Sequence, residues 1–197
     1  MTEMEREQEL RLVEALRRRD SAAFEAVHEA FHARLFGFLA RLSGNRDVAE
    51  DLAEETWLRL VTHAARLRPD TNLAAWIFTV ARNLHTSYCR SRLIEDSLSI
   101  GTLGLWPSTA MPPSPLESAT ASETAARLAM AFRKLPLLYR EALLLAAEGM
   151  RPSEAAVVCG VTPEAMRQRL SRARAQLDDR LTETTAFRLT SLQEVVT

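Results

Sequence analysis

The sequence predicts an all-α protein with two small helical domains, a flexible linker between them and a helix-turn-helix in the second domain. The 197 residues are 47% hydrophobic and include only 6 glycines, while the helix-favouring residues alanine, leucine, arginine and glutamate dominate. Apolar residues recur at helical spacing on both sides of a proline- and glycine-containing stretch that lacks this periodicity. We therefore assign residues 1–93 to the first domain, 94–121 to an acidic linker, 122–181 to the second domain and 182–197 to a C-terminal extension.

The helix-turn-helix prediction rests on a short helix, a glycine turn and a second helix. Ser153 can cap the short helix over residues 153–159, and Gly160 supplies the residue that tolerates a left-handed turn. Thr162 is a good N-cap for the second helix, and Pro163 suits its first position. A single apolar stripe is expected to hold this helix to a core: Met166, Leu170, Ala173 and Leu177.

Polar side chains cover the rest of this second helix, and the stretch from residue 167 to residue 174 contains four arginines and no acid. In helix-turn-helix proteins the second helix enters the major groove, where Arg and Gln read base edges and other arginines hold phosphates. We expect this face to bind DNA; the alternative is a solvated basic face on a bundle helix. The candidate residues are Arg167, Gln168, Arg169, Ser171, Arg172 and Arg174.

Two helices are predicted early in the first domain, after a charged helical segment over residues 1–19. The first begins at Asp20 or Ser21 and ends at residues 43–45. The second begins near Asp47, which has capping-box spacing to Glu50. The expected core stripe of the first helix is Phe24, Val27, Phe31, Leu35, Phe38 and Leu42.

A third helix is expected over residues 73–92, where Asn72 can act as the N-cap after a turn over residues 69–72. The polar face of this helix would be able to hold single-stranded bases or phosphates through Arg82 and Asn83, although a solvated surface is the alternative. The residues expected to face inward are Leu73, Trp76, Ile77, Val80, Leu84 and Tyr88.

Five acidic residues between Asp47 and Glu55 give the second helix like-charge pairs four residues apart, such as Glu50 with Glu54. Each such pair weakens an isolated helix by about a few tenths of a kcal/mol. A partner with basic residues would relieve the repulsion. The alternative is an ordinary solvated helix face.

Taken in order and spacing, these segments resemble the extracytoplasmic-function (ECF) sigma factors, the small two-domain class of bacterial promoter-specificity subunits. The resemblance covers roughly residues 20–92 and 124–181. Its segments in the first domain are Asp20-Ser21-Ala22-Ala23-Phe24-Glu25, Ala49-Glu50-Asp51-Leu52, Glu55-Thr56-Trp57-Leu58 and Ala75-Trp76-Ile77-Phe78-Thr79-Val80-Ala81-Arg82-Asn83. In the second domain they are Leu135-Pro136, Arg140-Glu141 and the run from Arg167 to Arg174.

The resemblance implies a cytoplasmic, non-enzymatic protein without a cofactor or metal. Its expected partners are core RNA polymerase, through the beta-prime clamp and the beta subunit, then promoter DNA, and an anti-sigma factor. Core polymerase would be bound through Asp51, Glu54 and Glu55. The minus-thirty-five promoter element would face the arginine-rich helix over residues 167–174. The minus-ten element would be recognised by Arg68, Asp70, Asn72, Arg82 and Asn83.

Other classes of protein remain open from the residues alone. A helix-turn-helix regulator would not need the acidic helix, and a sigma-like decoy that binds only an anti-sigma factor would lack the arginine face. The segment from His28 to His32 matches the His-Glu-x-x-His pattern of zinc metallopeptidases. No convincing third zinc ligand accompanies it, because His63 and His85 fall in the other two predicted helices.

Charge and composition limit these interpretations further. The net charge of -1 is unusual for an autonomous DNA-binding protein, so we expect DNA affinity to be local and to depend on a partner. Cys89 and Cys159 suggest no disulfide framework, and we expect neither a signal peptide nor membrane insertion. In the C-terminal extension, Leu189, Leu192 and Val196 share one face, which predicts either a short docked helix or a disordered tail.

Overall fold

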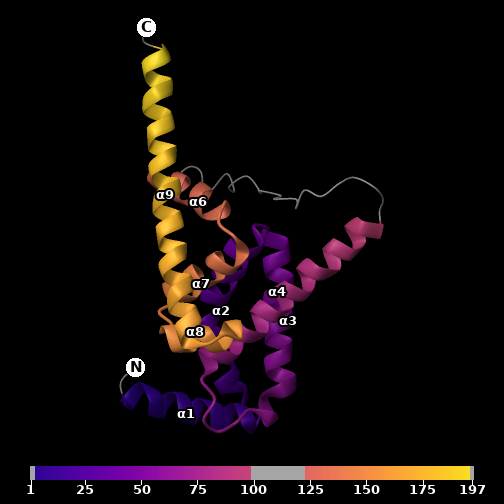
Figure 1. The fold of residues 1–197 in the computed structure, drawn as a ribbon. Coiled ribbons are helices and arrows are strands. Elements are labelled where there is room, and N and C mark those ends of the chain that lie inside the picture. Colours follow the sequence, from indigo (N-terminus) through magenta and orange to yellow (C-terminus); the bar gives the residue numbers. More distant parts are fainter. Residues whose placement is uncertain (1–2, 99–122, 196–197) are drawn as a thin grey trace. The chain divides into compact units, whose positions relative to one another are not determined.

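The computed structural model describes the backbone of residues 3–98 and 123–195, and every regular element in those ranges is helical (Figure 1). Side chains are described over residues 6–93 and 125–182. The chain divides into two compact units, the first holding helices α1 to α4 and the second holding α6, α7 and α9. This confirms the all-α prediction. The boundaries assigned from the sequence stay a prediction.

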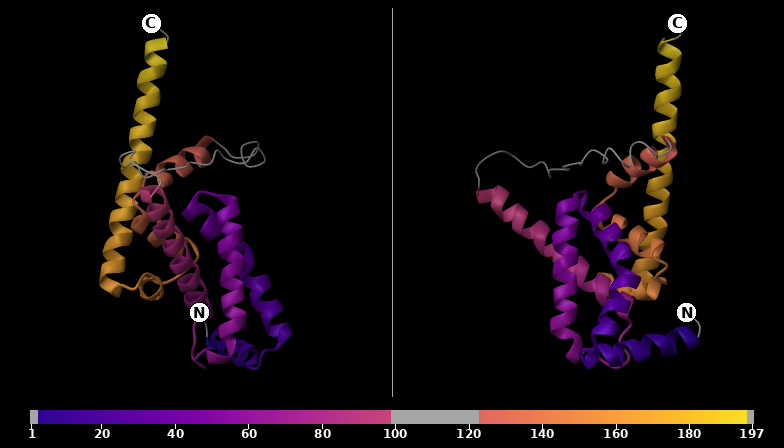
Figure 2. Two further views of the ribbon diagram at one scale, coloured as in Figure 1. Left: turned by 90° about the vertical axis from the view of Figure 1, so that its right-hand side faces the viewer. Right: turned by 180° about the vertical axis from the view of Figure 1, so that it is seen from behind.

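The first unit is a bundle of helices around a shared core. It contains α1 (Glu3–Arg17), α2 (Ser21–Ser43), α3 (Arg46–His63), a 3-10 turn η1 (Ala64–Arg66) and α4 (Leu73–Leu98). Helices α2, α3 and α4 pack against one another, and α1 packs on α2 and η1 across one end of the bundle (Figure 2). Phe38 of α2 meets Phe78 of α4 edge to face, with ring centroids 5.2 Å apart. Both rings are fully buried, so the core lies where these helices cross.

Capping explains where α2 and α3 begin. Asp20 is the N-cap of α2, and its side chain accepts a hydrogen bond from the backbone N–H of Ala22 at 2.8 Å. Helix α3 begins at Arg46, close to the predicted start near Asp47, but its N-cap is Asn45, whose side chain accepts a hydrogen bond from the N–H of Val48 at 3.2 Å. Asp47 therefore lies in the first turn, where a negative charge suits the helix dipole.

Helix α4 is longer than predicted and buries a wider face. It continues to Leu98, past the expected end at Arg92, while the rest of the predicted linker, residues 99–121, lies outside the described residues. Leu73 and Ile77 are buried as expected, but so are Phe78, Ala81 and His85, which the apolar stripe did not include. Because α4 packs against both α2 and α3, its buried surface exceeds a single stripe. The remaining residues predicted to face inward are half-buried: Trp76, Val80, Leu84 and Tyr88.

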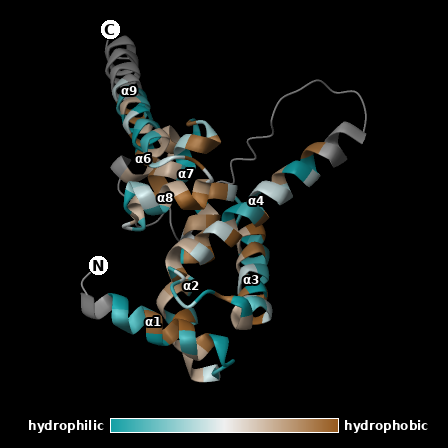
Figure 3. Ribbon diagram, turned by 60° about the horizontal axis from the view of Figure 1, so that its bottom comes forward, coloured by the Kyte–Doolittle hydropathy of each residue, from teal (hydrophilic) through white to brown (hydrophobic). Residues whose placement is uncertain are grey.

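The second unit is organised around its last helix. It contains α6 (Glu123–Arg133) and α7 (Leu137–Ala147), and α9 (Pro163–Val195) packs against both. Met166, Leu170 and Ala173 of α9 are buried as predicted, while Leu177 is half-buried. The helices of this unit carry both hydrophilic and hydrophobic residues (Figure 3). The predicted extension from residue 182 continues α9 as helix to Val195, and the side chains that would decide whether it docks lie outside the described range.

The turn between α8 (Pro152–Cys159) and α9 matches the predicted helix-turn-helix in its local geometry. Gly160 adopts a left-handed φ of 64°, and the hydroxyl of Thr162 accepts from the N–H of Ala165 at 3.2 Å to cap α9. Ser153 is not the cap of α8. Helix α8 begins at Pro152, one residue before the predicted start. At this end of the helix the carboxylate of Glu154 accepts a hydrogen bond from the backbone N–H of Arg151 at 2.8 Å.

Candidate nucleic-acid and protein interfaces

The six candidate DNA-binding residues of α9 fall into three groups around the helix. At about 100° per residue, Gln168, Ser171 and Arg172 point away from the buried stripe, and all three are exposed. Arg167 and Arg174 lie on one flank and are also exposed. Arg169 lies on the other flank, beside the core, and is half-buried. The structure therefore separates outward side chains suited to reach bases from flanking ones suited to hold phosphates.

An acid that the arginine count did not include lies in the first turn of α9. Glu164 accepts a hydrogen bond from Nε of Arg167 at 3.2 Å, and both side chains are largely exposed. This hydrogen bond and the positive charge of Arg167 hold the pKa of Glu164 below its ordinary value. The face is therefore less positive at its N-terminal end than the run of arginines predicts.

The acidic helix α3 carries its own counter-charges. Arg46 pairs with Glu50 at 3.2 Å, and Arg59 pairs with Glu55 at 2.8 Å. Both pairs are four residues apart, so they offset part of the predicted like-charge repulsion within the helix. Asp51 and Glu54 are exposed, and no ion pair is found for either within the described part of the chain. Both carboxylates are therefore available to a partner.

Two exposed apolar residues, missed by the sequence reasoning, continue the acidic face of α3. The side chains of Leu58 and Val61 are 58% and 53% exposed. The positions of Asp51, Glu54, Leu58 and Val61 are spaced three and four residues apart, so they form one stripe along the helix. The spacing of three and four residues along the helix from Asp51 is the sequence signal that would have identified Leu58 and Val61. We call these four residues the α3 face.

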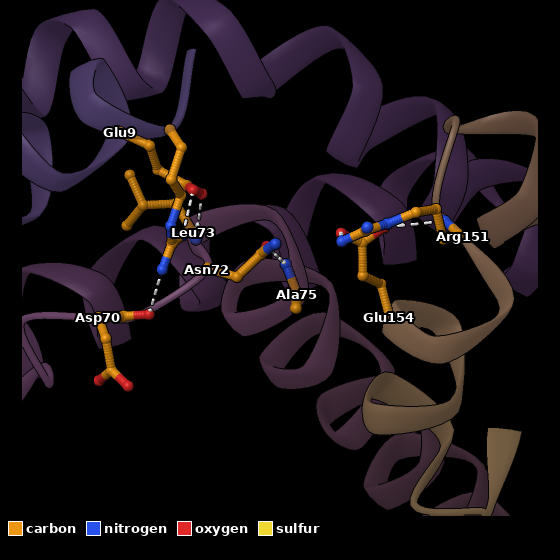
Figure 4. Close-up of polar contacts among 8 residues, drawn as sticks. Glu9, Asp70, Asn72, Leu73, Ala75, Arg151 and Glu154 are labelled. Atoms are coloured by element: carbon orange, nitrogen blue, oxygen red, sulfur yellow. Dashed lines mark hydrogen bonds and ion pairs between the residues drawn. The ribbon is translucent and has the colours of Figure 1, made fainter. Parts of the chain in front are cut away.

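The loop between η1 and α4, residues 67–72, holds three of the candidate minus-ten residues, and Figure 4 shows two of them, Asp70 and Asn72. Arg68 and Asp70 are exposed and form an ion pair at 3.2 Å. Asn72 is half-buried, and its side-chain oxygen accepts from the N–H of Ala75 at 2.8 Å. Asn72 therefore caps α4 as predicted, and its amide nitrogen can still donate hydrogen bonds to another partner.

Arg82 and Asn83, the other two candidates, lie further along α4. Ten residues separate Asn72 from Arg82, which corresponds to about 15 Å along a helix axis. Asn83 is exposed, whereas Arg82 is half-buried. The structure thus does not gather the five residues into one cluster, but arranges them along the loop and the helix that follows it.

The histidine pattern of the zinc metallopeptidases has a packing explanation here. The rings of His28 and His32 stack at 4.6 Å, and His28 also contacts Trp57 of α3 with centroids 4.8 Å apart. Within the described residues, no group of three His, Cys, Asp or Glu side chains could hold a metal ion. The two histidines therefore join α2 to α3, and the metallopeptidase alternative is not favoured. Nor, in those same ranges, is any helix long and apolar enough to cross a membrane.

Comparisons with known proteins find a family match in each half of the chain. The model of Sigma-70 region 2 matches residues 27–94, and that of Sigma-70 region 4 matches residues 125–177. The ECF RNA polymerase sigma factor EcfG of Rhodopseudomonas palustris is 36% identical over 144 residues, which cover 73% of this chain and 76% of the relative. The RNA polymerase sigma factor CarQ of Myxococcus xanthus is 31% identical over 168 residues, covering 84% and 94% respectively.

The fold is also found among solved structures. The sigma factor RpoE from Bartonella quintana, solved in complex with the anti-sigma factor NepR, superposes with a TM-score of 0.65 at 28% identity, covering 81% of this chain and 96% of that one. A regulator with a helix-turn-helix alone would not explain the match to region 2. The chain belongs to the ECF family of RNA polymerase sigma factors, and it binds core RNA polymerase and directs promoter-specific initiation of transcription.

Proposed function

We propose that this sigma factor divides its task among three surfaces: the α3 face with Glu55 for core polymerase, the loop over residues 67–72 with α4 for the minus-ten element, and the outward side of α9 for the minus-thirty-five element. The observation that carries this proposal is the composition of the α3 face. Acids and apolar side chains lie exposed together on one helix whose opposite side is buried. Such a face suits a partner surface that is basic at one end and apolar at the other.

The free energy expected from burying this face favours its contact with a partner protein. Fully burying a Leu or Val side chain contributes about 1.5–3 kcal/mol, so covering the exposed parts of Leu58 and Val61 would add on the order of 1 kcal/mol each. Asp51 and Glu54 would supply complementary charge, which mainly sets the association rate and the choice of partner. The family resemblance points to the beta-prime clamp as the occupant, with the beta subunit contacting another part of the chain.

The two DNA surfaces are expected to be weak when the protein is alone. The net charge is -1, and Glu164 offsets one of the arginines on α9. Affinity for duplex DNA depends on the number of phosphates neutralised, so a nearly neutral protein gains little from this source. Core polymerase would therefore supply most of the DNA affinity, and the sigma factor would supply the selection of sequence.

Regulation is proposed by analogy with the solved relative. RpoE was crystallised with the anti-sigma factor NepR, and we propose that an anti-sigma factor also binds this chain and competes with core polymerase. The protein would then act in the cytoplasm as a regulatory subunit without catalysis of its own.

In vitro transcription with purified core polymerase tests the proposal. The free protein should bind duplex promoter DNA weakly at physiological salt, whereas the holoenzyme should bind it well and start transcription at defined positions. Start-site mapping would identify the two promoter elements. Tight, sequence-specific binding by the protein without polymerase would instead support a helix-turn-helix regulator, and binding of an anti-sigma factor without any transcription would support a decoy.

A further inference from the structure

Helix α1 is tied to the end of the loop over residues 67–72, far along the chain (Figure 4). The Oε1 atom of Glu9 accepts a hydrogen bond from the backbone N–H of Leu73 at 2.9 Å. The guanidinium of Arg6 donates to the backbone carbonyl of Asp70 at 2.8 Å and also forms an ion pair with Glu9. Two side chains of one helix thus hold two backbone groups that flank the last residues of the loop.

The bond from Glu9 completes the capping of α4. The first N–H groups of a helix have no partner within it, and here Asn72 satisfies the N–H of Ala75 while Glu9 satisfies that of Leu73. A carboxylate at this end of a helix is also favoured by the helix dipole. The side chain of Glu9 is only 15% exposed, so solvent screens its interactions less than those of a surface ion pair.

The bonds within the loop are weaker restraints. Thr71 donates its N–H to the carbonyl of Arg68 at 3.0 Å, which closes a single turn. The ion pair of Arg68 with Asp70 has side chains that are 82% and 65% exposed, and such exposed pairs contribute little. The loop therefore depends on a neighbouring element to keep one conformation.

Helix α1 is placed to hold the loop at both ends. It packs against η1, which immediately precedes the loop, and Glu9 reaches Leu73, which immediately follows it. Val13 and Leu16 of α1 are fully buried, so the helix itself is fixed to the bundle. A loop anchored on both sides in this way is preorganised for its ligand.

We propose that Glu9 and Arg6 are positioning residues for promoter recognition: by fixing the loop over residues 67–72, α1 sets how accurately the minus-ten element is selected. The inference rests on the proposed minus-ten role of that loop. It assigns no contact with DNA to Glu9 or Arg6. Their effect passes through the backbone at Asp70 and Leu73, where it fixes the position of the exposed side chains of Arg68 and Asp70.

Glu9→Ala and Arg6→Ala, each in the full chain assembled with core polymerase, test this role. Glu7→Ala is the matched control, because Glu7 pairs with Arg11 at 2.6 Å on the same helix, with side chains 65% and 77% exposed, and no loop contact of this pair is found within the described residues. The readout is open-complex formation across a library of single-base changes in the minus-ten element. We expect Glu9→Ala to reduce discrimination about tenfold, the effect of one charge-assisted hydrogen bond, without changing core affinity.

A conservative variant and a physical measurement separate positioning from general destabilisation. Glu9→Gln keeps an acceptor for the N–H of Leu73 and should restore most of the discrimination. Hydrogen exchange of the Leu73 and Thr71 amides should be faster in Glu9→Ala and unchanged in Glu7→Ala. If Glu9→Ala lowers the melting temperature of the whole domain, Arg6→Ala provides the same test, because it removes the bond to the Asp70 carbonyl and leaves the acceptor for Leu73 in place.

The outcomes distinguish this inference from the proposed function on which it rests. Arg68→Ala and Asp70→Ala alter the loop directly. If they reduce minus-ten discrimination and Glu9→Ala and Arg6→Ala do not, the loop reads the promoter and the positioning role is wrong. If none of the four variants affects discrimination, the proposed minus-ten role of the loop fails, and the positioning role fails with it.

Discussion

The guanidinium of Arg167 lies against the carboxylate of Glu164 one turn earlier on α9, at the end of the helix that would enter the major groove. The pair is largely exposed, so it adds little to stability. Its consequence is electrostatic: Glu164 offsets the charge of one of the four arginines and presents a negative group where DNA phosphates are expected.

Neutralising Glu164 should therefore strengthen DNA binding without changing its sequence preference. For Glu164→Gln we expect the holoenzyme to bind all promoter variants more tightly at low salt, with the salt dependence of log K steeper by up to about one unit. Asp178→Asn is the control, an exposed acid about 21 Å further along the helix. Filter binding over a salt series measures the affinity and its salt dependence for each variant. A selective loss at a single base position would instead show that Glu164 reads a base.

Arg172 and Arg169 should differ, although both belong to the predicted DNA-binding set. Arg172 is exposed and points away from the core, whereas Arg169 is half-buried beside it. Arg172→Ala should cost about 1–3 kcal/mol of promoter binding if Arg172 reads a base, and relax selection at one position of the minus-thirty-five element. Arg169→Ala should affect DNA selection less. Promoter libraries tested with each variant would separate them, and equal effects would contradict this assignment.

Much of the fold could be predicted because local signals agree with one another. Asp20, Asn72, Thr162 and Gly160 each have the cap or turn geometry that their residue type favours. The N-cap of α3 was not predicted because Asn45 and Asp47 are both good N-caps, and only the structure shows that Asn45 makes the bond to Val48.

The features that were not predicted depend on tertiary contacts, which the periodicity of the sequence does not reveal. His85 is 2% exposed and lies within 3.6 Å of the sulfur of Cys89, yet a histidine on an otherwise mixed helix gives no sign of burial. Leu58 and Val61 are exposed although apolar residues usually face a core, so their hydrophobicity does not predict their place on the surface. The bond of Glu9 to Leu73 joins residues in different helices, so no local pattern predicts it.

The stability of the start of α8 depends on pH through the carboxylate of Glu154. Its carboxylate accepts from the backbone and the side chain of Arg151, both at 2.8 Å, and the side-chain hydrogen bond lowers the pKa of Glu154 below its ordinary value of 4.5. A lowered folded-state pKa adds stability that is present above the unfolded value and lost as the pH falls through the folded value. We therefore expect the second unit to lose stability below about pH 4.5.

Glu154→Gln should make the acid side of the stability profile shallower, measured as melting temperature by circular dichroism between pH 3 and 6. Glu164→Gln is the matched control, because Glu164 also pairs with an arginine three residues away but its side chain is 64% exposed, against 21% for Glu154. Solvent screening should leave the control close to the parent protein. Identical profiles for Glu154→Gln and the parent would show that the Arg151 pair does not contribute.

The α3 face makes the most direct prediction about polymerase. Asp51→Lys with Glu54→Lys should abolish core binding in a pull-down, because both acids are exposed on the stripe and their reversal would repel a basic partner. Each change should alter stability by no more than about half a kcal/mol, since neither side chain is buried. Glu25→Lys, an exposed acid on α2, controls for the change in net charge.

Leu58→Ala separates the apolar half of the face from the acidic half. Leu58 is more than half exposed in the free protein, so its truncation should leave the melting temperature nearly unchanged. In the complex it would be covered, and its loss should weaken core binding by on the order of 1 kcal/mol, or about fivefold, mainly through faster dissociation. Charge reversal should instead slow association and become less severe at high salt. If Leu58→Ala binds core as the parent does while the charge reversals do not, the partner touches only the acidic end. If neither class of variant has an effect, α3 has an ordinary solvated face and the polymerase contact lies elsewhere.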